Sequence, residues 1–561
     1  MRRGGKTTPP APERRELRIE ELKAILERAK DAPLSAEDHE TLEAAIDTLA
    51  YLTRELEAKG ASIARLRRLI FGSSTEKTSH VVGGTPEEDA SGGGGAEGAA
   101  DRAQAGEPSE TVHKGHGRHG AAAYRGAERV AVPHGSLKTG DPCPACTKGK
   151  VYLQGDPAVL VRVKGMAPLA ATVYEKERLR CNACLEVFTA QSPEGVGEEK
   201  YDETAASMIG LLKYGCGLPF HRLARLEGTL GIPLPAATQW EVVHRAAGLL
   251  EPAYGELVRQ GAQGEVVHND DTAMKILELG GETREEDGAD EESGEEFEGR
   301  TGTFTTGIVS TGDGHRIALF FTGRKHAGEN LADLLAQRAA ELAPPIQMCD
   351  ALSRNTAGEF DTILANCIAH ARRRFVEVAE NFPEECRHVL EALREVYRNE
   401  AVARREKMSP EERLRFHQVH SAPRMERLEG WLREQIEQRK VEPNSGLGQA
   451  IAYMRKHWPK PTLFLREPGA PLDNNLCERA LKKAILHRKN ALFYKTETGA
   501  RVGDLFMTLI HTAELSAVNP FEYLVSLQHH HERLAESPSQ WMPWTYGKTI
   551  ASLNSGVDPP P

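Results

Sequence analysis

The 561-residue sequence predicts a multidomain α+β protein, and three observations support this prediction. A chain of this length is typical of several domains of about 150 residues each. From residue 263 onward, short apolar segments with strand-like patterns alternate with helical patterns, as in mixed α/β cores. Before that point a heptad repeat, a Gly-rich stretch and two cysteine pairs indicate separate smaller units.

We predict the following parts in chain order: a flexible start or short helix (1–34), a coiled-coil helix (35–78), a disordered linker (79–128), a zinc-binding ribbon (129–197), a helical segment (198–262), an α/β core in two parts (263–384 and 471–515) with a helical insertion between them (385–470), and a C-terminal helical element and tail (516–561).

The coiled-coil prediction rests on a seven-residue repeat of Leu and Ile. The repeat runs from Leu42 to Ile70, and a heptad pattern of this length is typical of helices that pair with a second copy. We therefore expect a homo-oligomer. Gly60 within the repeat leaves open an amphipathic helix that packs on its own chain. The linker prediction follows from residues 83–110, which contain no Leu, Ile, Val, Phe, Tyr or Trp and cannot form a core.

The formal net charge of −11 does not exclude a nucleic-acid partner, because one segment supplies most of it. Residues 282–298 contain ten Asp or Glu and one Arg, whereas the rest of the chain sums to −2. No apolar run approaches the roughly 18 residues that a membrane helix needs, and the N-terminus has no apolar signal-peptide region. With nine cysteines and no export signal, we expect a reducing compartment, the cytoplasm.

Two CxxC pairs predict a structural zinc site. Each pair forms a tight knuckle that directs two thiolates at one ion, and four protein ligands leave no open position for water. The long spacing between the pairs fits a ribbon with extended hairpins, whose folding zinc would stabilise. The predicted ligands of one Zn²⁺ are Cys143, Cys146, Cys181 and Cys184.

The helical segment 198–262 contains two helical patterns separated by a Gly- and Pro-rich break that begins at Gly231. A helix, a turn and a second helix could form a DNA-binding helix-turn-helix, but helical hairpins that do not bind DNA are equally common. The pattern alone leaves both interpretations open.

The core prediction comes from four apolar segments that have the length and composition of strands. Helical patterns separate or follow these segments, and a charged helical stretch covers residues 385–440. The predicted strands are 265–271, 302–310, 316–322 and 345–350, and the predicted helices are 328–342, 369–380 and one that begins near Asn475.

Acidic residues at three places in this core could form a catalytic metal site. Asp270 and Asp271 follow the first apolar strand, Asp350 ends another strand, and Glu478 lies on the helix near Asn475. Carboxylates from strand ends and a helix can converge at a sheet edge and supply the oxygen ligands that Mg²⁺ prefers. Two such cations, Mg²⁺ or Mn²⁺, could activate an attacking oxygen and stabilise the leaving oxygen of a phosphoryl transfer.

Each acid also has a plain structural interpretation. An Asp at a strand end often forms an Asx turn, so either strand-end position could have that role. Glu478 follows Asn475 at capping-box spacing and could close the start of its helix. Spacing alone does not decide between Asp270 and Asp271.

Two basic clusters flank the acids in the sequence. Cations beside metal-binding carboxylates suit a polyanionic substrate, although either cluster could be a solvated helix face. The predicted DNA-binding residues are Arg372, Arg373, Arg374, Arg479, Lys482, Lys483, Arg488 and Lys489. Cys367 and His370 could form half of a metal site, but the sequence shows no partner for them.

Several motifs in fixed order resemble the insertion-sequence-sixty-six family of bacterial transposases. The most specific is LDNNLCERALKKAILHRKNALFYKTETGA (472–500), which is similar to the family's C-terminal catalytic motif. HNDDT (268–272) resembles its Asp-Glu-Thr motif, and CIAHARRRF (367–375) its Cys-x-x-His-x-Arg-Arg motif. Upstream, the resemblance includes residues 218–243, both cysteine pairs and IFGSSTEK (70–77), so that it covers roughly residues 40–530.

This resemblance implies a DDE transposase with a ribonuclease-H-like core. By position, Asp270 is the first acid, Asp350 the second and Glu478 the third, whereas Asp271 occupies the family's usual Glu. The implied activity is cleavage of element ends and joining of 3′-hydroxyls to target DNA, with two Mg²⁺ or Mn²⁺ ions in the site. The implied partners are DNA, a second copy of the chain and helper proteins of the same element, in a bacterial cytoplasm at the nucleoid.

One alternative function stays open. Ala351 and Leu352 stand where the family commonly has Gly and an aromatic residue, which is typical of a copy that has lost activity. Such a chain would be a decayed or domesticated, non-catalytic, zinc-containing DNA-binding protein.

Overall fold

The computed structural model describes residues 199–280 and 302–555, together with shorter stretches between residues 25 and 194. The chain divides into two compact units, Gly93–Thr172 and the combination of Met1–Gly92 with Val173–Pro561. Most of the predicted coiled coil, the whole predicted linker and the acidic segment 282–298 lie outside the described residues. These three predictions therefore stay predictions.

The cysteine region is described only in part. In the smaller unit, Cys143 lies in a tight antiparallel turn in which its backbone N–H donates to the Gly149 carbonyl at 2.8 Å. In the larger unit, β1 (Arg178–Arg180) pairs antiparallel with β2 (Val187–Thr189). Cys146, Cys181 and Cys184 lie outside the described residues, so the zinc ribbon and its ligand set stay predictions.

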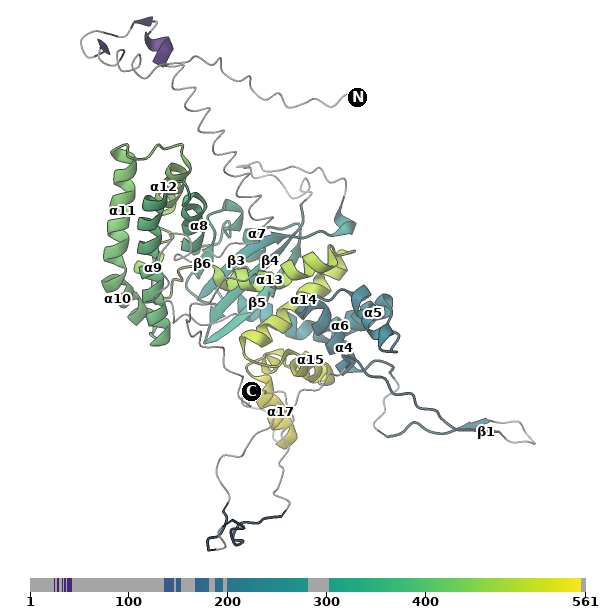
Figure 1. Ribbon diagram of the computed structural model, residues 1–561. Coiled ribbons are helices and arrows are strands. Elements are labelled where there is room, and N and C mark those ends of the chain that lie inside the picture. The colour runs from purple at the N-terminus through teal and green to yellow at the C-terminus, as the bar shows by residue number, and fades with distance from the viewer. Residues whose placement is uncertain are drawn as a thin grey trace, which may run out of the picture. The chain divides into compact units, whose positions relative to one another are not determined.

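The larger unit is built around a five-stranded mixed sheet with the order β5-β4-β3-β6-β7 (Figure 1). Three strands are antiparallel neighbours in a meander, and the last two run parallel to the first. The strands are β3 (Val266–Ala273), β4 (Phe304–Gly312), β5 (His315–Gly323), β6 (Ile346–Cys349) and β7 (Ile363–Asn366). All four predicted strands are present, whereas β7 was not predicted from the sequence.

Two groups of helices lie around this sheet. At one side, the helical insertion packs against β6 and β7 through a single apolar core that includes Ile346, Phe375, Leu393 and Leu432 (Figure 1). The start of its helix α10 follows from the sequence SPEE, because Ser409 and Glu412 form a capping box around Pro410. The helices of this group are α8 (Ile368–Val378), α9 (Pro383–Arg405), α10 (Pro410–His420), α11 (Ala422–Glu437) and α12 (Gly446–His457).

The second group covers the antiparallel strands. It includes α7 (Ala327–Leu335), which ends before the predicted limit of residue 342. The others are α4 (Glu203–Gly210), α5 (Phe220–Thr229), α6 (Ala236–Gly261), α13 (Asn475–Ala491), α14 (Glu497–Leu515), α15 (Pro520–His529), α16 (His531–Glu536) and α17 (Tyr546–Ser555). No helix of the described residues is long and apolar enough to cross a membrane.

The predicted helix-turn-helix segment corresponds to α5 and α6. Gly231, in the left-handed region at φ +83°, lies in the turn that separates them. The second helix has 26 residues, and its buried face, which includes Val243, Leu250 and Leu257, packs against α4, α14 and β5. This segment is therefore part of the body that covers the sheet, and its role in DNA binding stays a prediction.

The outer edge of β5 is covered by side chains of α14. Successive turns of this helix present Asp504, Thr508 and Thr512, which accept hydrogen bonds from the backbone N–H groups of Thr322, Phe320 and Ala318 at 2.7 to 3.1 Å. The spacing of four residues on the helix matches the alternate N–H groups of the strand. The amides that an edge strand leaves unpaired are thus bonded within the chain.

Candidate active site

Asp270 and Asp271 are neighbours on β3 and therefore have their side chains on opposite faces of the sheet. Gly307 of β4 lies opposite Asp270 in the register. A Cβ at Gly307 would approach the Leu481 side chain to 2.9 Å, so glycine allows α13 to pack closely here. The Cys477 thiol also donates to the Gly307 carbonyl at 3.1 Å. The helix that bears Glu478 is thereby fixed above the strand that bears Asp270.

Asp350 lies at the same end of the sheet as Asp270, because β6 runs parallel to β3. His268 is paired with Met348, so Asp270 and Asp350, each two residues further on, emerge side by side. Asn355 joins them: its side-chain amide donates to Asp350 Oδ1 at 2.5 Å and to Asp270 Oδ1 at 3.5 Å. Asp350 Oδ1 also accepts the backbone N–H of Leu352 at 3.3 Å, the bond expected of an Asx turn.

Glu478 lies in the first turn of α13, where its side chain is 30% exposed. Its carboxylate is 3.9 Å from His370 Nε2, and the helix starts at Asn475 with no side-chain cap from Asn474. Burial, and then the negative charges of Asp350, Asp271 and Glu478, raise the pKa of Asp270 from 3.8 to about 7. Asp350 and Glu478 therefore lie close enough to Asp270 for their negative charges to raise its pKa.

A network of buried hydrogen bonds connects the segments that bear the acids. Asn474 connects three segments: its Oδ1 lies 3.1 Å from His268 Nδ1, its amide donates to the Asn269 carbonyl at 3.0 Å, and its backbone N–H donates to Cys367 Sγ at 3.2 Å. Next to it, the Asn269 side chain donates to the Asn355 carbonyl at 2.7 Å. These bonds tie the start of α13 to β3 and hold the carboxylates in place.

Asp271 has a different environment from Asp270. Its side chain is 3% exposed, with Oδ2 at 2.9 Å from His326 Nδ1 and Oδ1 at 3.8 Å from an Arg354 guanidinium nitrogen. Asp271 is thus paired with cationic or neutral partners on the other side of the strand, whereas Asp270 is directed toward the two other acids.

The predicted DNA-binding residues fall into two classes. Lys483 and Arg488 bond within the fold: Lys483 Nζ is 2.9 Å from Glu514, and Arg488 donates to the Ala273 carbonyl at 2.6 Å. Others are exposed along the two helices that also bear His370 and Glu478, and Arg374 lies over the Tyr453 ring at 3.9 Å. The exposed ones are Arg373, Arg374, Arg479, Lys482 and Lys489, and Arg372 is partly exposed.

Sequence reasoning did not identify Asn355 or Asn474 as residues of this site. Asn474 belongs to the DNN triplet of the C-terminal motif. The motif indicated that this segment lies near the site, but it did not indicate what the Asn474 side chain contacts. Asn355 lies only five residues after Asp350, but its contact with Asp270, 85 positions away, depends on the folded topology.

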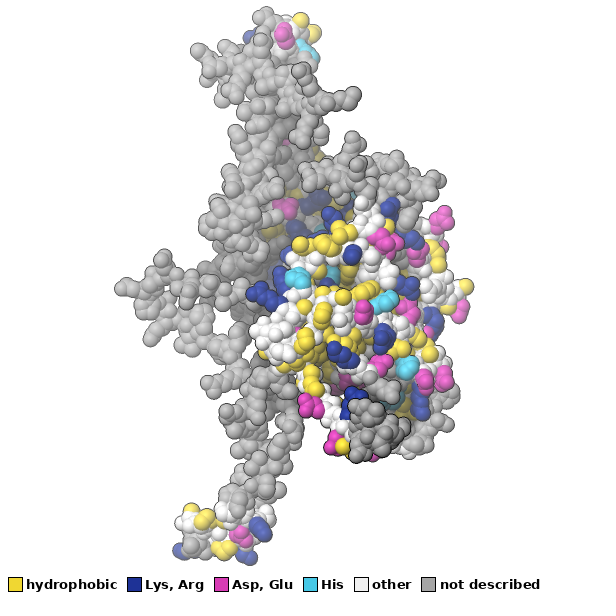
Figure 2. Space-filling view, turned by 90° about the vertical axis from the view of Figure 1, so that its right-hand side faces the viewer, with side chains coloured by type: hydrophobic (Ala, Val, Ile, Leu, Met, Phe, Trp, Pro, Cys, Tyr) yellow, Lys and Arg dark blue, Asp and Glu magenta, His cyan; other side chains and the backbone are white. Residues whose placement is uncertain are grey.

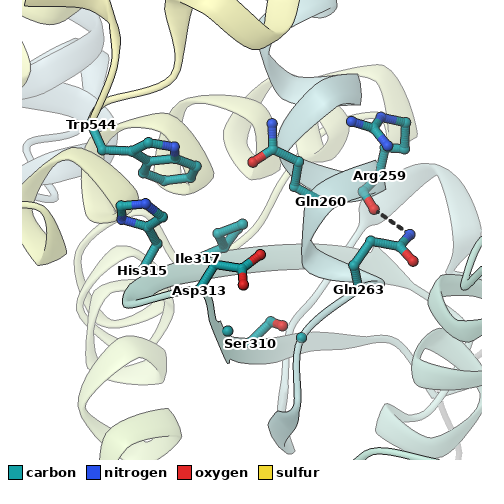
Figure 3. Close-up of a pocket in the computed structure, with 10 residues that line it drawn as sticks. Arg259, Gln260, Gln263, Ser310, Asp313, His315, Ile317 and Trp544 are labelled. Carbon is teal, nitrogen blue, oxygen red and sulfur yellow. Dashed lines mark hydrogen bonds between the residues drawn. The ribbon is translucent and has the colours of Figure 1, made fainter. Parts of the chain in front are cut away.

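A cavity of about 260 Å³ lies beside Gly264, which precedes β3, and none of the three acids lines it (Figure 3). It borders the β4–β5 turn at Asp313, where the His315 and Trp544 rings stack with centroids 4.4 Å apart. Gln263 points back to its own helix, donating to the Arg259 carbonyl at 2.8 Å. The cavity is therefore separate from the carboxylate cluster.

Charge on the face shown in Figure 2 is mixed. Lys and Arg side chains are interspersed there with Asp, Glu and apolar side chains. Clustered carboxylates at a sheet edge, with exposed cations on the two helices beside them, are the arrangement that a DNA-processing enzyme requires. This is the class of protein that the fold and the site indicate.

Comparison with known proteins agrees with this class. A family model described as Transposase IS66 family matches residues 200–502, more than half of the chain, and the chain belongs to this family. The match includes the sheet, the helical insertion and the helix that bears Glu478.

Curated relatives come from Sinorhizobium fredii (strain NBRC 101917 / NGR234). The uncharacterized protein y4jD is 25% identical over 505 residues, which are 87% of this chain and 93% of the relative. The uncharacterized protein y4hP is 24% identical over 67% of this chain and 68% of its own length. A third, y4qI, is 30% identical over 31% of this chain and 32% of its own length.

Proposed function

We propose that this protein is a DDE transposase that cuts the ends of an insertion sequence and joins their 3′-hydroxyls to target DNA. The observation that carries the proposal is the meeting of Asp270, Asp350 and Glu478, which come from two strands and a helix far apart in the sequence. Membership of a transposase family supports DNA as the substrate.

The strand order supports a ribonuclease-H-like core. Three antiparallel strands followed by two parallel ones, with the first strand in the centre, give the order β5-β4-β3-β6-β7. In this arrangement the two aspartates lie on the adjacent central strands, and the helix with the third acid packs on β3 and β4. We propose this fold assignment together with the function.

The donor chemistry of the site fits divalent cations. Three carboxylates supply oxygen ligands, and burial together with the neighbouring negative charges raises the pKa of Asp270, so a bound cation would stabilise its ionised form. Asp270, Asp350 and Glu478 would hold two Mg²⁺ or Mn²⁺ ions. When bound, these ions would activate the attacking oxygen and stabilise the charge that develops on the leaving oxygen.

The chain's own residues would orient the reactants. Asn355 holds the carboxylates of Asp350 and Asp270 in a fixed relation, and Asn474 fixes the start of α13 to the strand. The exposed cations of α8 and α13 would bind phosphates on either side of the cleaved bond. Because those contacts are made to the backbone, they would position DNA without selecting its sequence.

The remaining parts would serve the assembly of the DNA complex. We propose that the zinc ribbon and the α5–α6 segment bind element ends, and that the N-terminal helix pairs two copies, since two ends must be joined together. Purified protein should then contain about one Zn²⁺ per chain in the ribbon. Cys181→Ser should release this ion, and full zinc occupancy of the ribbon in that variant would refute the ligand set. Helper proteins of the same element are further proposed partners.

The test is a transposition assay in cells on the intact native element, comparing the wild type with Asp350→Ala. Losing a carboxylate that serves the metals costs several kcal/mol of transition-state stabilisation, so hopping should fall by at least about 1000-fold. Asp361→Ala is the matched control, because this aspartate is exposed and outside the cluster. Equal hopping of wild type and Asp350→Ala would contradict the proposal.

A further inference from the structure

Two helices begin beside each other at the acidic edge, and their first turns bring together three unlike donor groups. Cys367 precedes α8, His370 lies in the first turn of α8, and Glu478 lies in the first turn of α13. The helix starts are joined directly, since the backbone N–H of Ile368 donates to the Leu472 carbonyl at 3.0 Å.

The donor atoms of this cluster are close enough to share one ion. The Cys367 sulfur, a ring nitrogen of His370 and a carboxylate oxygen of Glu478 all lie within 4.8 Å of one another. In a tetrahedral zinc site, bond lengths of about 2.0 to 2.3 Å place donor atoms about 3.3 to 3.6 Å apart. Movements of about 1 Å by the partly exposed His370 and Glu478 side chains would therefore complete the geometry.

A second observation also points to a ligand. The Nδ1 atom of His370 is buried and has no hydrogen-bond partner among the described residues. A buried imidazole nitrogen without a partner is unfavourable unless something else binds it. In addition, the Asn474 N–H donated to the Cys367 sulfur is the type of outer contact that orients a metal-bound thiolate.

We infer that Cys367, His370 and Glu478 form a binding site for a thiophilic divalent cation, Zn²⁺ in the first place. Sulfur and imidazole donors favour Zn²⁺ over Mg²⁺, which prefers oxygen ligands alone. Three protein ligands leave a fourth position open, unlike the closed site of four cysteines predicted for the ribbon. The side chains of His370 and Glu478, 27% and 30% exposed, provide a route of entry for the ion.

Occupation of this site has a consequence for the acidic cluster. One oxygen of Glu478 cannot coordinate both the thiophilic ion and the two hard cations. Zn²⁺ would therefore compete with Mg²⁺ for Glu478, the third acid of the proposed catalytic site. This regulatory consequence rests on the proposed function, whereas binding of the ion does not.

The binding test counts zinc in the full-length protein after equilibrium dialysis against buffered Zn²⁺. His370→Ala and Glu478→Gln should each contain about one Zn²⁺ per chain fewer than the wild type. Cys367→Ser should show the same loss and should also weaken the sulfur-to-metal absorption band after loading with Co²⁺. Cys386→Ser is the matched control, because its thiol is equally buried in α9 but outside the cluster.

Two outcomes overturn the binding inference. One is wild-type zinc content in both His370→Ala and Glu478→Gln, whose side chains are partly exposed and whose folding is checked by circular dichroism. The other is an equal loss in the Cys386→Ser control. Either result would leave Cys367 and His370 as residues that only join the two helix starts.

A separate measurement tests the competition. In Mg²⁺-dependent nicking of element-end DNA, added Zn²⁺ should inhibit the wild type, and His370→Ala should retain a larger fraction of its own zinc-free rate. Zinc binding without inhibition of the wild type would overturn the competition and count against Glu478 as a catalytic acid. Absence of zinc binding with normal nicking would overturn the new site and leave the proposed function intact.

Discussion

Two carboxylates in this protein, one buried and one partly buried, have opposite surroundings. In the helical insertion, Glu400 accepts from Arg413 Nε at 2.7 Å and lies 3.0 Å from His417 Nε2. Burial raises the pKa of Glu400, but the hydrogen bond from His417 and the charge of Arg413 outweigh it and lower the pKa from 4.5 to about 2. At the sheet edge, burial and neighbouring carboxylates instead raise the pKa of Asp270 from 3.8 to about 7.

The difference separates a stabilising ion-pair cluster from a candidate binding site. Glu400 has its charge balanced inside the chain, so it joins α9 to α10 and leaves nothing for a ligand to neutralise. Asp270 is partly buried beside other carboxylates, and burial together with their charges raises its pKa, which is typical of candidate functional sites. The neighbours of each carboxylate, together with its burial, thus decide the direction in which its pKa is shifted.

The pH dependence of stability should differ between the two regions. Because the folded-state pKa of Glu400 lies below 4.5, its contribution is fully present above pH 4.5 and is lost as the pH falls toward about 2. Because the folded-state pKa of Asp270 lies above 3.8, the folded state holds the extra proton, and stability falls as the pH rises from 3.8 to about 7.

Removing the balancing charge should have the largest effect on stability. Arg413→Ala leaves Glu400, 8% exposed, without its main cation and should lower the free energy of unfolding by about 3 to 5 kcal/mol. Urea unfolding followed by circular dichroism measures the change. A loss below about 1 kcal/mol would show that the ion pair between Arg413 and Glu400 contributes little to the stability of the fold.

The opposite change at the sheet edge should stabilise the fold. Asp270→Asn removes a charge that burial, and then the neighbouring carboxylates, disfavour, and should raise the free energy of unfolding at pH 8 by up to about 4 kcal/mol, the equivalent of the shift in pKa. The gain should disappear at pH 4, where the wild-type carboxyl is protonated in the folded state. Asp361→Asn, at an exposed aspartate, serves as the control, and equal stability of Asp270→Asn and wild type at both pH values would refute the charge repulsion.

Divalent cations that bind the carboxylate cluster should neutralise its negative charge and so stabilise the folded protein. At pH 8 and a concentration 100 times the dissociation constant, Mg²⁺ should stabilise the wild type by about 2.7 kcal/mol. Thermal unfolding with and without Mg²⁺ measures this effect in the wild type and in Asp350→Ala. A shift of the same size in both proteins would place the Mg²⁺ elsewhere.

The smallest effect should come from the third partner of Glu400. Arg404 Nε is 2.9 Å from Glu400 Oε1, but the arginine side chain is 69% exposed. Arg404→Ala should therefore lower the free energy of unfolding by no more than about 1 kcal/mol, because water screens exposed ion pairs. The same urea measurement applies, and a loss as large as that of Arg413→Ala would erase the distinction between buried and exposed partners.

The elements that the sequence predicted well are those with strong local patterns. Residues 316–322 contain an apolar run of sufficient length, and β5 lies there, whereas 265–271 have only Val266 and Val267 before polar residues and still form most of β3. Strand β7 has only the four residues Ile363–Asn366, too few for an alternating pattern to appear. It exists because β6 offers it a partner, a contact that no local window contains.

The same reasoning separates the parts of the candidate site. The acids were found from strand ends and from a family resemblance, because both signals are local in the sequence. Asn474 was missed as a supporting residue because its side chain contacts Asn269, 205 positions away along the chain. Hydrogen bonds across such distances follow from the folded topology and leave no spacing to recognise. The metal ions and the roles of the acids stay predictions.

The covered edge of β5 limits how copies of this chain can join. Asp504, Thr508 and Thr512 occupy the amides through which a strand from another molecule would have to pair. The sheet therefore cannot continue into a second copy at that edge, either in a functional assembly or in an aggregate. Any complex that holds two copies must therefore be built from contacts elsewhere on the chain.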